Sequence, residues 1–192
     1  FSLLVHEISH GVMAYICGDN TAKNYGRLSL NPLHHLDPLG TIFPILLILS
    51  GSSFVFGWAK PVPINYYRLK YGRLGEFLVA IAGVLSNILL AIIGMFLFKH
   101  FYEVLAPLHL LEPVLYMISL NILLAVFNIM PIPPLDGSRV LASIGSYDLR
   151  DSIFHMDRYG IFIIMILSWT GFLYKFIAPV YMAILSFLDK LI

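Results

Sequence analysis

Residues 74–98 read LGEFLVAIAGVLSNILLAIIGMFLF, an apolar run in which Glu76 is the only charged residue. A run of this kind is typical of a helix that crosses a lipid bilayer, because about 20 helical residues span the hydrocarbon core. A second such run covers 113–130, and 161–188 is apolar apart from Lys175. The last run fits either one long tilted span or a helical hairpin. Together these runs predict an all-α polytopic membrane protein, folded as a helical bundle.

The composition agrees with this class. The 192 residues are 59% hydrophobic and 12% charged, whereas soluble domains carry about 25% charged residues. The formal net charge of +1 gives no indication of a nucleic-acid partner. Cys17 is the one cysteine, which excludes an internal disulfide framework and a cysteine-rich metal site.

The length suits one compact bundle, so we expect 1–192 to form a single transmembrane domain. The sequence begins at Phe1, inside an apolar run and without a basic flank. We therefore expect that the N-terminal part of the first helix is missing, rather than that a signal peptide was cleaved.

The segment after the first apolar run, 1–17, is less regular. Residues 25–32 alternate and end in Asn-Pro, which favours a short extended or β element. Residues 41–57 are apolar but interrupted by proline and glycine, and they have the shortest length that could span a bilayer. A re-entrant path for 41–57 gathers nearly all basic residues on one side, which the positive-inside rule places in the cytoplasm. We therefore expect this segment to re-enter rather than to span.

The first apolar run contains HEISH at residues 6–10. On a helix, histidines four positions apart lie one turn apart on one face and can share a metal ion. Glu7 follows the first histidine and can reach a water on that metal, as a general base must. Ionisable residues at membrane depth are costly and usually functional. The motif therefore predicts a zinc site with His6 and His10 as ligands and Glu7 as the base.

A catalytic zinc site usually has three protein ligands, so a third must come from elsewhere in the chain. Asp136 is the strongest candidate, because it follows the stretch 128–135, NIMPIPPL, whose prolines end a helix and fix an extended path. Gly137 allows the backbone to approach closely. From spacing alone, Asp136 is equally well interpreted as a ligand or as the N-cap of a helix over 137–144.

Two separated motifs together resemble the site-2 protease family of intramembrane zinc metalloproteases. They are HEISH at 6–10 and NIMPIPPLDG at 128–137, in the order that the family has. Residues 83–87, GVLSN, resemble the family's G-x-x-x-N segment, with valine where proline is common. Residues 56–63, FGWAKPVP, resemble a stretch of short bacterial members without inserted domains. The resemblance covers 1–145, and the last part of the chain adds only hydrophobicity.

The resemblance implies one Zn²⁺ per chain, bound by His6, His10 and Asp136, with Glu7 as the catalytic base. It implies a metalloendopeptidase, a multi-pass protein of the cell membrane. Such an enzyme hydrolyses peptide bonds in or near the transmembrane segments of other membrane proteins. Its partners would be those transmembrane substrates and the lipid bilayer, with no nucleic acid.

Two asparagines complete the expected site. Asn87 and Asn128 match family positions that help to hold the substrate or the oxyanion, while hydrogen bonding between helices is the other interpretation of both. Two further functions stay open: a membrane zinc carrier that binds metal without hydrolysis, and a catalytically inactive scaffold. A carrier gains nothing from a glutamate beside the first histidine, which favours the protease.

Overall fold

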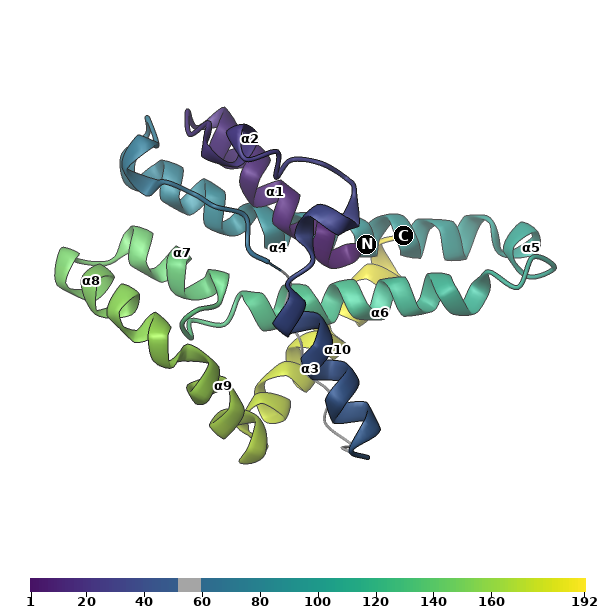
Figure 1. Ribbon diagram of the computed structural model, residues 1–192. Coiled ribbons are helices and arrows are strands. Elements are labelled where there is room, and N and C mark those ends of the chain that lie inside the picture. Colours follow the sequence, from purple (N-terminus) through teal and green to yellow (C-terminus); the bar gives the residue numbers. More distant parts are fainter. Residues whose placement is uncertain (52–59) are drawn as a thin grey trace.

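The computed structural model describes residues 1–51 and 60–192, and Figure 1 shows them as a bundle of helices. In that part of the chain no residue forms a strand. The helices are α1 (Ser2–Ile16), α2 (Thr21–Asn24), α3 (Pro38–Leu49), α4 (Gly72–His100), α5 (Tyr102–Leu105), α6 (Leu111–Asn128), α7 (Asp136–Ile144), α8 (Tyr147–Met156), α9 (Gly160–Trp169) and α10 (Phe172–Leu191), with short 3₁₀ turns η1 (Pro32–His35), η2 (Tyr66–Arg68) and η3 (Asp157–Tyr159). The prediction of an all-α protein is therefore confirmed for the described residues.

The two irregular elements expected after the first helix fare differently. Residues 25–32 contain no strand: α2 ends at Asn24, and turns lead from there to η1. The predicted re-entrant segment, 41–57, begins within α3, which ends at Leu49. The rest of that segment, from residue 52, lies outside the described residues, so the re-entrant path stays a prediction.

Among the described residues, α4, α6 and α10 are long and apolar enough to cross a membrane. The first two agree with the spans expected at 74–98 and 113–130. The run 161–188 is two helices, α9 and α10, which separate at Gly171. The φ of Gly171 is +72°, in the left-handed region that glycine adopts without steric cost. The chain therefore turns there, and α10 alone has membrane length.

The helix α4 lies at the centre of the bundle, against α1, α6 and α7 (Figure 1). A core of apolar side chains joins α4 to α6 and α10: Ala91, Met95, Ile118, Ile122, Val126 and Leu188. At Gly94 a Cβ atom would stand 2.7 Å from Cγ1 of Ile118, so α4 and α6 approach closely because this residue has no side chain.

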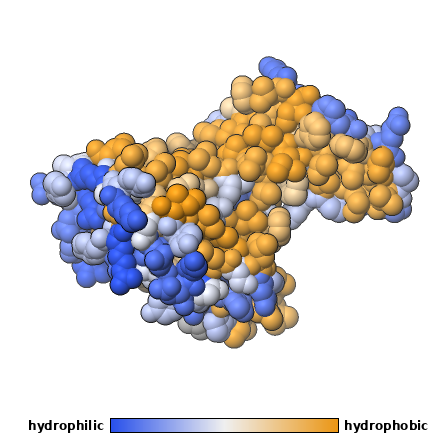
Figure 2. Space-filling view, turned by 90° about the horizontal axis from the view of Figure 1, so that it is seen from above, coloured by the Kyte–Doolittle hydropathy of each residue, from blue (hydrophilic) through white to orange (hydrophobic). Residues whose placement is uncertain are grey.

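The surface has two characters (Figure 2). Hydrophilic residues gather at the end of the molecule that carries α2, α7 and α8, and apolar residues cover much of the remaining face. Large apolar side chains stay exposed on the long helices, among them Leu85, Leu89 and Ile93 on α4 and Leu123 on α6. Apolar surface of this extent suits contact with lipid.

Charged pairs join neighbouring helices at both ends of α4. Arg150 of α8 donates two hydrogen bonds to the carboxylate of Glu76 on α4, at 2.8 and 3.1 Å. Lys99 lies at the opposite end of α4 and pairs with Asp189 of α10 at 2.9 Å. The first pair ties α8 to the N-terminal end of α4, close to the helices that carry the predicted site residues.

Candidate metal centre

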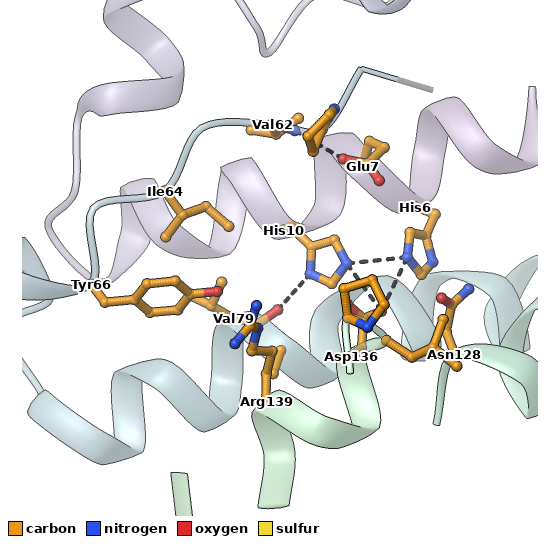
Figure 3. A pocket seen from close by; sticks show the side chains of 14 residues that line it. His6, Glu7, His10, Val62, Ile64, Tyr66, Val79, Asn128, Asp136 and Arg139 are labelled. Carbon is orange, nitrogen blue, oxygen red and sulfur yellow. Dashed lines mark hydrogen bonds and ion pairs between the residues drawn. The ribbon is translucent and has the colours of Figure 1, made fainter. Parts of the chain in front are cut away.

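The two histidines of the HEISH motif lie one turn apart on α1 and are both buried, 4% and 7% exposed. Their Nε2 atoms are 3.1 Å apart. The Oδ2 atom of Asp136 stands 3.1 Å from the Nε2 of His6 and 3.2 Å from that of His10 (Figure 3). The fold thus brings together three ligand-type atoms from α1 and α7, residues separated by more than a hundred positions.

The position of Asp136 excludes one of its two interpretations, the N-cap. Helix α7 begins at Asp136 itself, its N-cap is Leu135, and no side chain caps it. Asp136 is therefore not an N-cap, and its carboxylate faces α1 instead. The next residue, Gly137, lies against the end of α6, where a Cβ atom would stand 2.0 Å from the carbonyl oxygen of Ile129. This close backbone contact fixes the start of α7, and hence Asp136, beneath the two imidazoles.

The hydrogen bonds on the far side of each ring determine which nitrogen carries the proton. The Nδ1 of His10 lies 2.7 Å from the carbonyl oxygen of Val79, which can only accept, so Nδ1 is the protonated nitrogen. The Nδ1 of His6 lies 2.6 Å from Oδ1 of Asn87, again an acceptor. In the neutral form of each ring, Nε2 is then the unprotonated nitrogen, and it faces Asp136, as in an imidazole that binds a metal.

With both rings neutral, three acceptors converge on one point. The Oδ2 of Asp136 is buried and has no hydrogen-bond partner, and facing lone pairs repel unless a cation lies between them. Donor atoms 2.0–2.1 Å from a tetrahedral zinc ion are about 3.3 Å apart, close to the 3.1–3.2 Å separations here. Two imidazoles and a carboxylate therefore fit a divalent ion that keeps a fourth position open.

Helix α4 closes the other side of the cluster at Gly83. A Cβ atom there would stand 2.4 Å from Nε2 of His10 and 2.6 Å from Cε1 of His6. In folded proteins a Cβ atom essentially never lies within 3.0 Å of another side chain's heavy atom. The first residue of the GVLSN segment must therefore be glycine for the imidazoles to pack against α4.

A pocket of about 230 Å³ opens beside the cluster (Figure 3). Glu7 lines it, and the backbone N–H of Val62 donates a 3.0 Å hydrogen bond to its Oε2. Asn128 also lines the pocket, with its Nδ2 bonded at 3.0 Å to the carbonyl of Leu124 one turn earlier in α6. Both residues therefore stand where they can meet a bound substrate.

Asn87 lies elsewhere. It is fully buried between α1 and α6, and both ends of its amide are engaged, with His6 and with Asn121. The walls of the pocket, as far as the described residues form them, do not include it. Of the two interpretations, hydrogen bonding between helices describes its contacts. Asn121 was not predicted from the sequence, because the sequence does not show which residue a polar side chain within an apolar run will contact.

Arg139 and Tyr66 also line the pocket, and the sequence did not indicate either of them. Arg139 stands one turn after Asp136, and its guanidinium points toward the side of the pocket where the Tyr66 hydroxyl lies (Figure 3). Asp157 forms an ion pair with Arg139. The Phe154 ring lies against the guanidinium of Arg139, with 4.2 Å between the ring centroid and Cζ. Burial raises the pKa of the Tyr66 phenol, so its hydroxyl keeps its proton at neutral pH. Asp157, in η3, thus supports the pocket through its ion pair with Arg139.

Fold and cluster together define a helical membrane protein with a candidate metal centre. The model of Peptidase family M50 matches residues 99–167, a range that includes Asp136 but not the HEISH motif. Over 175 residues the chain is 42% identical to "Putative zinc metalloprotease YwhC" of Bacillus subtilis (strain 168). This alignment covers 88% of the chain and 77% of that relative. Over 172 residues it is 26% identical to "Putative zinc metalloprotease Rip2" of Mycolicibacterium smegmatis, 88% of this chain and 64% of the relative. No solved structure matches.

The chain therefore belongs to peptidase family M50, the site-2 protease family. It is a metalloprotease, and its cofactor is Zn²⁺. The resemblance drawn from the two motifs is confirmed by these relatives, which extend it beyond residue 145.

Proposed function

We propose that this chain is a zinc-dependent intramembrane endopeptidase of the cell membrane, with 1–192 as a single protease domain. Its substrates would be membrane proteins, cut in or near their transmembrane segments. One observation carries the proposal: the three ligand-type atoms of His6, His10 and Asp136 lie within 4.8 Å of one another, and Glu7 lines the pocket beside them. Among the described residues, three helices of membrane length support the intramembrane setting.

In this proposal His6, His10 and Asp136 would hold the zinc ion through two Nε2 atoms and one carboxylate oxygen. When bound, zinc would act as a Lewis acid that polarises a carbonyl group, and it would lower the pKa of a water molecule to about 7. The Nδ1 hydrogen bonds of both rings keep the Nε2 atoms turned toward Asp136, where the ion would be held.

Glu7 acts as the general base. Its carboxylate receives the proton of the attacking water and passes it to the nitrogen of the leaving amine. The N–H of Val62 stabilises the ionised carboxylate and orients it along the pocket wall. The Asn128 amide has a second N–H besides the one bonded to Leu124, and this donor would stabilise the developing oxyanion.

Substrate and water must both reach this pocket. A helical substrate hides its carbonyls in hydrogen bonds, so the segment to be cut has to unwind locally, and helix-destabilising residues near the cut would help. The exposed apolar faces of α4 and α6 suit the approach of a transmembrane substrate from the lipid. The hydrophilic end with α7 and α8 offers the side from which water can enter (Figure 2).

The test uses detergent-purified protein and a panel of single-span membrane substrates, with and without a zinc chelator. Glu7→Gln should lower turnover by a factor of about 10²–10⁴ and leave the zinc content unchanged. A zinc carrier would be indifferent to Glu7→Gln, and an inactive scaffold would cleave nothing before substitution. Asp136→Ala should remove the zinc. Retention of the metal in that variant would show that another residue is the third ligand.

A further inference from the structure

A chain of buried polar groups runs from the candidate metal centre into the core of the bundle. The Nδ1 of His6 lies 2.6 Å from Oδ1 of Asn87, and Nδ2 of Asn87 donates at 2.8 Å to Oδ1 of Asn121. Nδ2 of Asn121 donates in turn to Oγ of Ser2, at 2.9 Å, and to the carbonyl oxygen of Met117, at 2.8 Å. The two asparagines are 0% exposed. These hydrogen bonds connect α1, α4 and α6.

The donors and acceptors of these hydrogen bonds can be assigned in only one way. A carbonyl oxygen can accept but not donate, so the Met117 carbonyl requires the NH₂ group of Asn121 on its side. The oxygen of the Asn121 amide must then face Asn87, which answers with its own NH₂ group. The Asn87 oxygen is left for His6, so the Nδ1 of His6 must carry the proton.

The two histidines differ in what orients them. The Nδ1 of His10 bonds to the backbone carbonyl of Val79, which no side-chain substitution can reverse. The Nδ1 of His6 depends on two amide side chains, and an amide can turn end for end. If the Asn121 amide is lost, Asn87 is free to present NH₂ to His6, and the proton then moves to Nε2, the nitrogen that faces Asp136.

We propose that Asn121 is a positioning residue that fixes Nε2 of His6 as a metal-binding nitrogen, acting through Asn87 from the core of α6. This inference rests on the proposed ligand role of His6. Asn121 thereby contributes to the zinc site, although it does not line the pocket and is not one of the three clustered residues. Residues that orient ligating histidines contribute about 10–100-fold to metal affinity.

The first test compares zinc affinities by competition with a chromophoric chelator, on detergent-purified full chain. Asn121→Leu should weaken zinc binding about 10–100-fold. Asn121→Thr should stay close to the unsubstituted protein, because a threonine hydroxyl donates to the carbonyl one turn earlier and still accepts from Asn87. The matched control is Ile122→Ala, a fully buried neighbour on α6, which should lower the melting temperature without changing zinc affinity.

A second test separates positioning from simple packing. In the Asn87→Asp background, both oxygens at position 87 accept, so His6 keeps its Nδ1 proton whatever stands at 121. Asn121→Leu should therefore not weaken zinc binding in that background, where it also removes the Asn121 oxygen that faces the carboxylate, although it weakens binding in the unsubstituted protein. If Asn121→Leu does not fold, Asn121→Ala carries the same comparison, with melting temperatures of the metal-free proteins measured alongside.

The outcomes separate the two proposals. If His6→Ala leaves zinc affinity unchanged, His6 is not a ligand, and both the proposed centre and this inference fall. If His6→Ala abolishes binding while Asn121→Leu behaves like Ile122→Ala, the centre stands and the role of Asn121 is refuted. An equal loss from Asn121→Leu in both backgrounds at position 87 would also refute it, since a packing defect does not depend on the direction of the amide.

Discussion

Gly83→Ala offers the most direct test of how the fold builds the candidate metal centre. The added methyl group would stand 2.4 Å from Nε2 of His10 and 2.6 Å from Cε1 of His6, where ordinary contact begins at 3.4 Å. The rings or helix α4 must therefore move by about 1 Å, while metal sites tolerate ligand displacements of only about 0.2 Å. Neither ring is free to give way, because the Nδ1 atoms are held at 2.6 and 2.7 Å.

The stability cost of Gly83→Ala is expected to be small. Overpacking costs about 1–3 kcal/mol, and the higher helix propensity of alanine returns about 1 kcal/mol. The effect on zinc should be much larger, a loss of affinity of about 100-fold or more, since both histidines are displaced. Gly94→Ala is the matched control on the same helix, because its Cβ would meet only apolar side-chain atoms of Ile118 and Met117, at 2.7 and 2.8 Å.

The assay measures zinc content after purification, zinc affinity by chelator competition, and the melting temperature with the metal removed. Both variants should show similar, modest changes in melting temperature, and only Gly83→Ala should lose zinc. Equal zinc affinity in Gly83→Ala and Gly94→Ala would refute the reasoning, because the imidazoles would then not be packed against this point of α4.

Two further predictions concern the elements around the site. Gly137→Ala would place a Cβ atom 2.0 Å from the backbone oxygen of Ile129, so it should separate α7 from the end of α6, destabilise the fold by about 2–3 kcal/mol and lower zinc affinity; an unchanged melting temperature in the presence of chelator would contradict this. Arg150→Ala removes the two hydrogen bonds to Glu76, whose side chain is 10% exposed. It should cost about 1–2 kcal/mol, because part of the pair meets solvent. Glu76→Gln in the Arg150→Ala background should recover stability, and thermal unfolding of the four proteins forms the cycle that checks it.

Most of the helices could be predicted from the sequence, because hydrophobicity over a window of membrane length is a local property. The spans at 74–98 and 113–130 correspond to α4 and α6 within a few residues. The break within 161–188 was left open by the periodicity, although Gly171 marks it once its left-handed φ is known. The extended element expected at 25–32 did not form, since alternation over so few residues is a weak signal without a partner strand.

The candidate site divides in the same way. His6, Glu7 and His10 follow from a four-residue spacing on one helix, so local geometry was enough to predict that they lie together. Asp136 could be named only as one of two equal interpretations until the family resemblance was added. In the structure its carboxylate meets both imidazoles because Gly137 lets α7 start against the end of α6. Its role as a zinc ligand remains a prediction for the experiments above.

What the sequence determined by itself was the class of protein: apolar runs of membrane length fix the helices, and the 6–10 motif fixes a pair of imidazoles on one turn. What only the tertiary structure decided was which polar groups meet. Asn87 and Asn121 are polar residues within apolar runs, and the sequence does not indicate that they pair. Their pairing depends on how α4 and α6 are rotated about their axes and how closely glycine lets them pack. Rotation and distance between helices arise from contacts distant in sequence, which local periodicity does not record.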